Sequence, residues 1–105
     1  MTTLKVLTAA RAKIADKKNW TQGWFALRLD GDGILRDTDS MSTSAVCWCS
    51  TGAIRVVLQV DDHTDLPPDL ISAFCMGSAG DIEDFNDTHT HAEVLAAFDQ
   101  AIATL

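Results

Sequence analysis

The clearest hydrophobic pattern in the chain lies toward its C-terminal end. Thr90 and Glu93 have the spacing of a capping box, in which each side chain bonds the other residue's backbone N–H where a helix begins. The apolar residues that follow share one helical face: Val94, Leu95, Phe98, Ile102 and Leu105. Near the N-terminus the same spacing is shown by Leu4, Leu7, Ala10 and Ile14. We therefore predict helices over residues 3–17 and from Thr90 onward.

The segment after the first helix has the pattern of a small β-hairpin. An apolar run over residues 24–29 leads into the turn sequence Asp30-Gly31-Asp32-Gly33, and the apolar pair Ile34-Leu35 follows. Residues 36–44 are rich in Asp, Ser and Thr, so we expect a polar linker there.

The middle of the chain predicts a buried central helix over residues 45–60, because most of its apolar residues fall on one helical face. The β-branched run over residues 54–60 is equally compatible with a strand, so both alternatives stay open for that stretch.

A further helix is predicted where Pro67 and Pro68 stand, since a first helical turn tolerates proline. We expect Gly77 and Gly80 to end it, and residues 81–85 to add only a short turn. Together the patterns predict a mainly α fold, a compact bundle of about four helices with a small β-hairpin inserted after the first helix.

Length and composition fit one globular domain over residues 1–105. Hydrophobic residues make up 47% of the chain and charged residues 22%, which is ordinary globular usage. A chain of this size buries enough surface to fold without a disulfide or a metal, so we expect no cofactor and assign no metal ligand. Three cysteines, an odd number, are expected to be reduced thiols.

The net charge of −7 is unevenly distributed. Residues 1–28 hold six basic side chains against one acid, whereas residues 29–105 hold two basic side chains against fourteen acids. Because an acidic surface repels phosphate groups, we expect the protein to bind neither nucleic acid non-specifically nor anionic membranes. A protein with a basic surface fits better as a partner. No apolar run is long enough for a membrane span and the first residues lack a signal peptide's hydrophobic core, so we expect a cytoplasmic protein.

One hypothesis for the chemistry is a thiol-dependent hydrolase or transferase. Cys49 would be the nucleophile near the start of the central helix, where the positive end of the dipole lowers a thiol's pKa. His91 would be the base, Asn86 or Asp87 would orient it, and Gln22 would donate to an oxyanion. The simpler alternative is that Cys49 is a buried core residue on an apolar helical face.

A second hypothesis uses overlapping side chains as a zinc site, with Cys47 and Cys49 facing His89 and His91. The ligand types fit, but residues two apart on a helix point about 200° apart, so the spacing disfavours the site.

A third hypothesis is a binding surface made by Trp20, Trp24, Gln22 and Glu93. The alternative for the tryptophans is that their rings supply core area while their N–H groups bond loop carbonyls. Glu93 is better explained as the capping-box partner than as a general acid.

Three short signatures occur in a fixed order along most of the chain. They are Trp20-Thr21-Gln22-Gly23, Trp48-Cys49-Ser50-Thr51-Gly52-Ala53, and Asn86-Asp87 followed by Thr90-His91-Ala92-Glu93-Val94. With these signatures the chain resembles a family of small bacterial and bacteriophage domains of unknown function. The resemblance implies no established activity, but it favours a helix over residues 45–60.

The polar positions of that family map onto Trp20, Gln22, Cys49, Asn86, Asp87, His91 and Glu93. Cys47 and His89 lie outside the pattern, which counts against the zinc hypothesis. The sequence departs from the family by a short gap between the Asn86-Asp87 and Thr90-His91 pairs, so the relative placement of those pairs stays open.

From these observations we predict a small acidic, protein-binding regulatory or accessory domain in a phage or mobile-element setting. The alternative is the thiol-dependent enzyme that uses Cys49 and His91.

Overall fold

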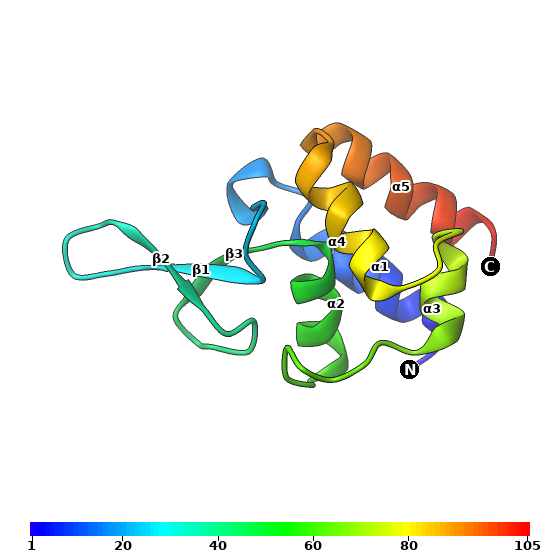
Figure 1. Ribbon diagram of the computed structural model, residues 1–105, viewed down its shortest axis with the longest axis horizontal. Coiled ribbons are helices and arrows are strands. Elements are labelled where there is room, and N and C mark those ends of the chain that lie inside the picture. The colour runs from blue at the N-terminus through cyan, green and yellow to red at the C-terminus, as the bar shows by residue number, and fades with distance from the viewer.

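The computed structural model describes residues 1–105 and contains five α-helices, one 3-10 turn and a three-stranded sheet (Figure 1). In chain order the elements are α1 (Thr3–Lys13), η1 (Lys17–Asn19), β1 (Ala26–Leu29), β2 (Leu35–Thr38), β3 (Ala45–Trp48), α2 (Ser50–Leu58), α3 (Pro68–Ala73), α4 (Ala79–Thr88) and α5 (His91–Ala103).

The sheet is antiparallel, with strand order β2-β1-β3. The turn between β1 and β2 is fixed by the Asp30 carboxylate, whose Oδ1 accepts the backbone N–H of Asp32 at 2.8 Å and of Ile34 at 3.0 Å. Gly33 completes the turn with φ 75°, a conformation that suits glycine. The hairpin projects away from the helices, and an isolated bridge between Trp20 and Trp48 adjoins β3 (Figure 1).

The prediction of a mainly α bundle with an inserted hairpin is wrong. The hairpin exists, but β3 adds a third strand to it, and residues 36–38 belong to β2 rather than to a polar linker. The predicted helix over residues 45–60 divides at Cys49, which has extended backbone (φ −79°, ψ 178°). Residues before Cys49 pair with β1, and those after it form α2, so the open stretch 54–60 is helical as far as Leu58.

Helix boundaries differ from the sequence prediction where glycine was taken as a stop signal. α3 ends at Ala73, and Cys75 rather than a glycine adopts the left-handed conformation (φ 58°) after it. Gly80 lies inside α4, because Ser78 and Asp81 form a capping box that begins a helix there. The short turn predicted over residues 81–85 is therefore part of a ten-residue helix.

The predicted start of α5 is confirmed. Thr90 N donates to Glu93 Oε1 at 2.9 Å and Glu93 N donates to Thr90 Oγ1 at 3.2 Å, which completes the capping box. These bonds stabilise the carboxylate, so they hold the pKa of Glu93 below its ordinary value. Of the predicted apolar face, Val94 and Phe98 are buried, whereas Leu105 lies beyond the end of α5 and is 54% exposed.

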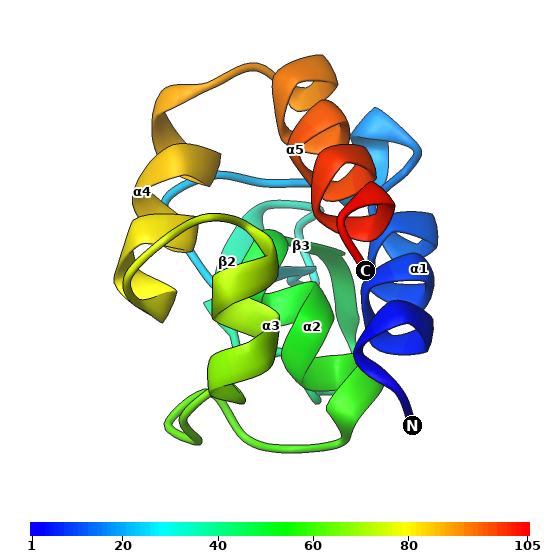
Figure 2. The same ribbon diagram turned by 90° about the vertical axis from the view of Figure 1, so that its right-hand side faces the viewer.

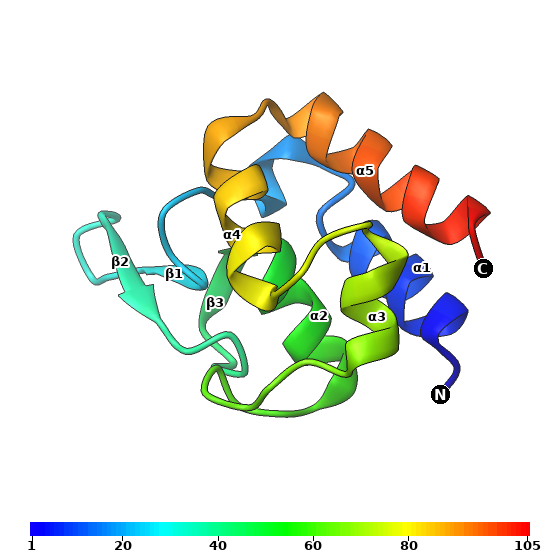
Figure 3. The same cartoon turned by 45° about the vertical axis from the view of Figure 1, so that its right-hand side comes forward.

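The five helices surround one apolar core (Figures 2 and 3). α1 packs against α2, α3 and α5, and α4 packs against α2 and α5. The largest buried apolar side chains come from four helices and the segment after α1, and they are Phe98, Leu7, Ile14, Ile54, Leu70 and Val94. Leu4, which belongs to the predicted apolar face of the first helix, is exposed. No helix combines the length and the hydropathy that crossing a bilayer requires.

Candidate functional site

Asn86 is the centre of a buried hydrogen-bond network that joins the three sequence signatures. Its side chain is fully buried. Oδ1 accepts the Trp20 indole N–H at 2.8 Å, the Ser50 backbone N–H at 3.0 Å and the Ser50 hydroxyl at 2.8 Å. Nδ2 donates to the Thr21 carbonyl and to Asp87 Oδ1, each at 3.0 Å. Every polar atom of the side chain is used, so Asn86 holds α4, α2 and the loop before β1 together.

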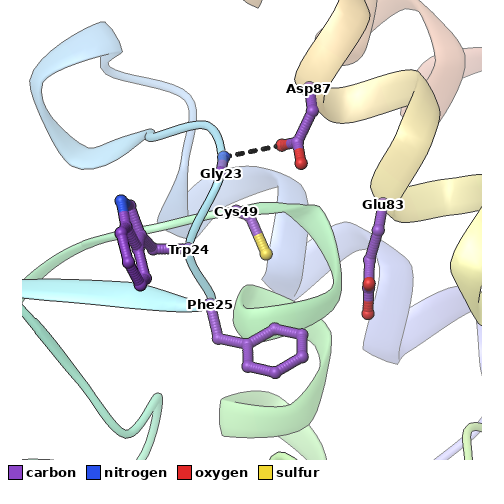
Figure 4. Close-up of a pocket in the computed structure, with 6 residues that line it drawn as sticks. All are labelled: Gly23, Trp24, Phe25, Cys49, Glu83 and Asp87. Atoms are coloured by element: carbon purple, nitrogen blue, oxygen red, sulfur yellow. Dashed lines mark hydrogen bonds between the residues drawn. The ribbon is translucent and has the colours of Figure 1, made fainter.

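Gln22 and Gly23 connect the same loop to the end of α4. Gln22 Nε2 donates to the Asn86 carbonyl at 3.0 Å and to the His89 carbonyl at 2.8 Å. Both amide protons of Gln22 are therefore engaged, and neither is free for an oxyanion. Gly23 N donates to Asp87 Oδ1 at 2.9 Å, which leaves Asp87 Oδ2 without an internal partner (Figure 4).

Cys49 caps the N-terminus of α2. Its Sγ accepts the Gly52 backbone N–H at 3.4 Å and lies 3.4 Å from Thr51 Oγ1. Because Thr51 Oγ1 donates to the Glu83 carboxylate at 3.3 Å, the thiol is the donor in its contact with Thr51. The side chain is only 3% exposed, and burial raises the pKa of the Cys49 thiol even though the hydrogen bond from the Gly52 N–H acts in the opposite direction. The thiol is therefore held neutral rather than activated.

His91 and Cys49 have different hydrogen-bond partners. Its Nε2 donates to the Ile14 carbonyl at 2.6 Å, and its ring packs 5.3 Å from the Trp20 ring. No hydrogen bond joins His91 to Cys49, and Asn86 and Asp87 bond other groups. The geometry gives the pairing of thiol and imidazole no support.

The four side chains of the zinc hypothesis are engaged separately. His89 stacks on Phe85 and bonds its carbonyl through Nδ1 at 2.9 Å, and Cys47 is buried in β3. No group of three or more His, Cys, Asp or Glu side chains has an arrangement that could hold a metal ion.

The three tryptophans have different surroundings. Trp20 and Trp48 are partly buried against the core. The Trp48 indole N–H donates to the Ser40 carbonyl at 2.9 Å, and this agrees with the alternative in which a tryptophan N–H bonds a loop carbonyl. Trp24 is 56% exposed. More than half of the Trp24 side chain is therefore open to solvent.

A pocket of about 180 Å³ opens beside Trp24 (Figure 4). Its lining residues are Gly23, Trp24, Phe25, Cys49, Glu83 and Asp87. Glu83 and Asp87 lie one helical turn apart on α4, so both carboxylates face the pocket from the same side. In Figure 4 the indole of Trp24 lies on the side of the Gly23–Phe25 backbone that points away from Glu83 and Asp87.

The two carboxylates differ in how far their charge is balanced. Glu83 Oε1 lies 3.8 Å from the guanidinium of Arg55, which is 5% exposed, bonds the Thr64 carbonyl and packs on the Phe25 ring. Asp87 has no ion-pair partner. The uncompensated charge at the pocket is therefore that of Asp87.

Sequence reasoning found Trp24, Cys49 and Asp87 but missed Phe25, Glu83 and Arg55. Glu83 was missed because residues 81–85 were taken for a short turn, which hid its helical relation to Asp87. The sequence does contain a signal for the start of this helix, because Ser78 and Asp81 have the spacing of a capping box.

Native iodoacetamide labelling should modify Cys75 alone. Cys75 is exposed, whereas Cys47 and Cys49 are buried and burial raises the pKa of both thiols. We expect these two to react about a hundredfold or more slowly than Cys75, at a rate set by opening of the structure. Mass spectrometry of the intact and digested protein gives the rates. In urea all three thiols should react alike; native labelling of Cys49 at the rate of Cys75 would contradict the buried, neutral thiol.

Residues 1–104 match the model of a protein family described as Family of unknown function (DUF6197). No curated protein and no solved structure matches the chain.

Proposed function

Because the chain belongs to DUF6197, a family of unknown function, we propose its role from its own geometry: a small acidic protein that binds a basic side chain of a partner protein in the pocket beside Trp24. The observation that carries the proposal is a small pocket lined by the exposed residue Trp24 and by Asp87, whose carboxylate oxygen Oδ2 has no internal partner.

The chemistry of the pocket suits a cation. The face of an indole attracts a cation, and a carboxylate accepts its N–H donors. Arginine uses both features best, because its planar guanidinium stacks on aromatic rings and donates in a fork. The volume of about 180 Å³ is below that of most small-molecule sites and fits one side-chain head group. The net charge of −7 favours encounter with a basic surface.

The proposed role is regulatory or accessory rather than enzymatic. The neutral, capped thiol of Cys49 and the separate surroundings of His91 offer no activated nucleophile. Binding without chemistry is what the arrangement of Trp24 and Asp87 supports. The phage or mobile-element setting is part of the proposal and rests on the sequence resemblance alone.

Acetyl-arginine amide should bind at this pocket with a dissociation constant of about 1 mM, the affinity expected for a head group of its size. Two-dimensional ¹H–¹⁵N NMR should show the largest shifts at Gly23 and the Trp24 indole. Trp24→Ala should abolish the shifts at Gly23, and Asp87→Asn, which keeps the oxygen that Gly23 N bonds, should weaken binding about fivefold.

The matched control is Asp84→Asn. Asp84 is an exposed residue of α4 that does not line the pocket, and its replacement removes the same charge. We expect its affinity to stay within about twofold of the wild type, because charges on the surface are screened. Equal weakening by the two Asp→Asn variants would mean diffuse attraction to an acidic protein, and the pocket would not be the binding site.

A further inference from the structure

A separate cavity of about 380 Å³, the α5 cavity, is lined by residues of α5 from Glu93 to Ala101, by Phe85 of α4 and by residues 73–76. It shares no lining residue with the pocket beside Trp24. Eight of its ten lining residues are hydrophobic, and its volume lies in the usual range of small-molecule sites, about 300–1,000 Å³. We infer that the α5 cavity binds a small organic cation that has an apolar body and an ammonium end.

The α5 wall of the cavity is hollow because that face of the helix carries alanine. Ala96, Ala97 and Ala101 line the cavity together with Glu93 and Gln100. Positions three or four apart lie on one face of a helix, so these five side chains belong to a single face of α5. The three alanine side chains end at Cβ, and they leave space for an apolar group between the longer side chains of Glu93 and Gln100.

The segment after α3 forms a second wall. Phe74, Cys75 and Met76 are consecutive in the sequence, and all three line the cavity. Neighbouring residues can face one space here because the chain turns, with Cys75 in the left-handed conformation (φ 58°) just beyond the end of α3. The Phe74 ring is fixed by edge-to-face packing on Phe98 of the core, with 5.0 Å between the ring centroids. Aromatic and sulfur-containing side chains of this kind suit a hydrocarbon ligand.

The charge in the cavity comes from one carboxylate. Glu93 lines the cavity, and the lining contains no lysine, arginine or histidine. The hydrogen bond from Thr90 N to Glu93 Oε1 fixes the carboxylate without neutralising it, and Glu93 takes part in none of the four ion pairs. Hydrogen bonding from Thr90 also holds the pKa of Glu93 below its ordinary value, so the group is ionised at neutral pH. A fixed negative charge in an apolar cavity favours a ligand with a cationic end over one with a carboxylate.

Charge also favours a small cation over a second copy of the chain as the occupant. A second copy carries the same net charge of −7 toward a cavity whose ionised group is itself a carboxylate. An alkylammonium ion brings a positive charge instead. Its hydrocarbon part gains about fourfold in affinity for each methylene group that it buries.

The test titrates propyl-, butyl- and hexylammonium chloride, 1-hexanol and sodium hexanoate into the protein at pH 7, followed by two-dimensional ¹H–¹⁵N NMR. The backbone amides of Ala96, Ala97 and Gln100 should shift, and affinity should rise about fourfold for each added methylene group. Hexylammonium should bind about fivefold more tightly than hexanol, the effect of one partly exposed ion pair. Hexanoate should leave these amides unshifted.

A pair of leucine variants tests the location of the site. Ala96→Leu fills the cavity from an exposed position of α5, so it should abolish the shifts at Ala97 and Gln100. Ala92→Leu is the matched control, because Ala92 is also an exposed residue of α5 but does not line the cavity. We expect Ala92→Leu to bind hexylammonium as the wild type does.

A pair of charge variants tests the role of the carboxylate. Glu93→Gln should bring the affinity for hexylammonium down to that for hexanol and leave hexanol binding unchanged, since glutamine also completes a capping box and the helix should persist. Asp84→Asn removes the same charge from an exposed position of α4 outside the cavity, and it should keep the fivefold preference.

Three results would overturn the inference: no shift at these amides with any of the ammonium ions, shifts that persist in Ala96→Leu, or a preference for hexylammonium that survives in Glu93→Gln. Shifts at the same amides that depend on protein concentration alone would show that a second copy occupies the cavity, and they would overturn it too. None of these results affects the proposed function, because binding in the other pocket is read separately from the Trp24 indole.

Discussion

Gly52→Ala should destabilise the protein by about 3 kcal/mol or more, because there is no room for a side chain at this position. Gly52 is buried in the first turn of α2. A Cβ atom there would fall far inside van der Waals contact with the Phe25 carbonyl oxygen and 2.8 Å from Ser40 Oγ. The carbonyl cannot simply retreat, since it accepts the Cys49 backbone N–H at 3.1 Å. Urea denaturation followed by tryptophan fluorescence measures the loss.

Gly80→Ala is the matched control for this substitution. Gly80 is also helical, but a Cβ atom there would meet nothing closer than Ser78 Oγ at 3.5 Å, which is ordinary contact. Alanine should therefore stabilise α4 by about 0.5 kcal/mol through its better helix propensity. The two substitutions should change the free energy of unfolding in opposite directions, and this difference separates the effect of helix propensity from that of steric exclusion. A Gly52→Ala variant within about 0.5 kcal/mol of the wild type would contradict the close approach of α2 to the Phe25 backbone.

The parts of the fold that could be predicted from the sequence are those with local causes. The α5 capping box of Thr90 and Glu93 and the turn that follows Asp30 depend on residues only a few positions apart. The division of residues 45–60 at Cys49 has a distant cause, because β3 exists only where it pairs with β1. Cysteine is also not among the usual capping residues, so nothing local marked the start of α2.

The sequence predicted which residues belong to the candidate site better than it predicted what each residue does there. Trp20, Gln22, Asn86 and Asp87 do meet, as one network. Asparagine beside aspartate is equally suited to orienting a catalytic histidine and to joining backbone segments, and only the partners of each atom distinguish these roles. Asp37, Asp39 and Asp62 line a pocket with Trp24 only because the fold brings them together, so the sequence held no signal for that pocket.

Asn86→Ala should destabilise the protein by about 4 kcal/mol, because it removes the partners of several buried groups at once. The Trp20 indole N–H, the Ser50 backbone N–H and the Ser50 hydroxyl all lose their acceptor, and the Thr21 carbonyl loses a donor. Each buried group left without a partner costs about 1–3 kcal/mol, reduced where water enters the space. The measurement is again equilibrium urea denaturation, with the Trp20 indole followed by NMR.

Asn19→Ala is the control, since Asn19 makes no side-chain hydrogen bond and its loss should change stability by less than about 0.5 kcal/mol. Asn86→Asp separates the two halves of the network. It keeps the acceptor for Trp20 and Ser50 but places an oxygen against the Thr21 carbonyl and the Asp87 carboxylate, where Nδ2 donates now. We expect it to cost about 2 kcal/mol or more, because two acceptors then face each other without a proton. If Asn86→Asp matched the wild type, the donor half of the network would be dispensable, and the link from α4 to the loop before β1 would rest on Trp20, Gln22 and Gly23.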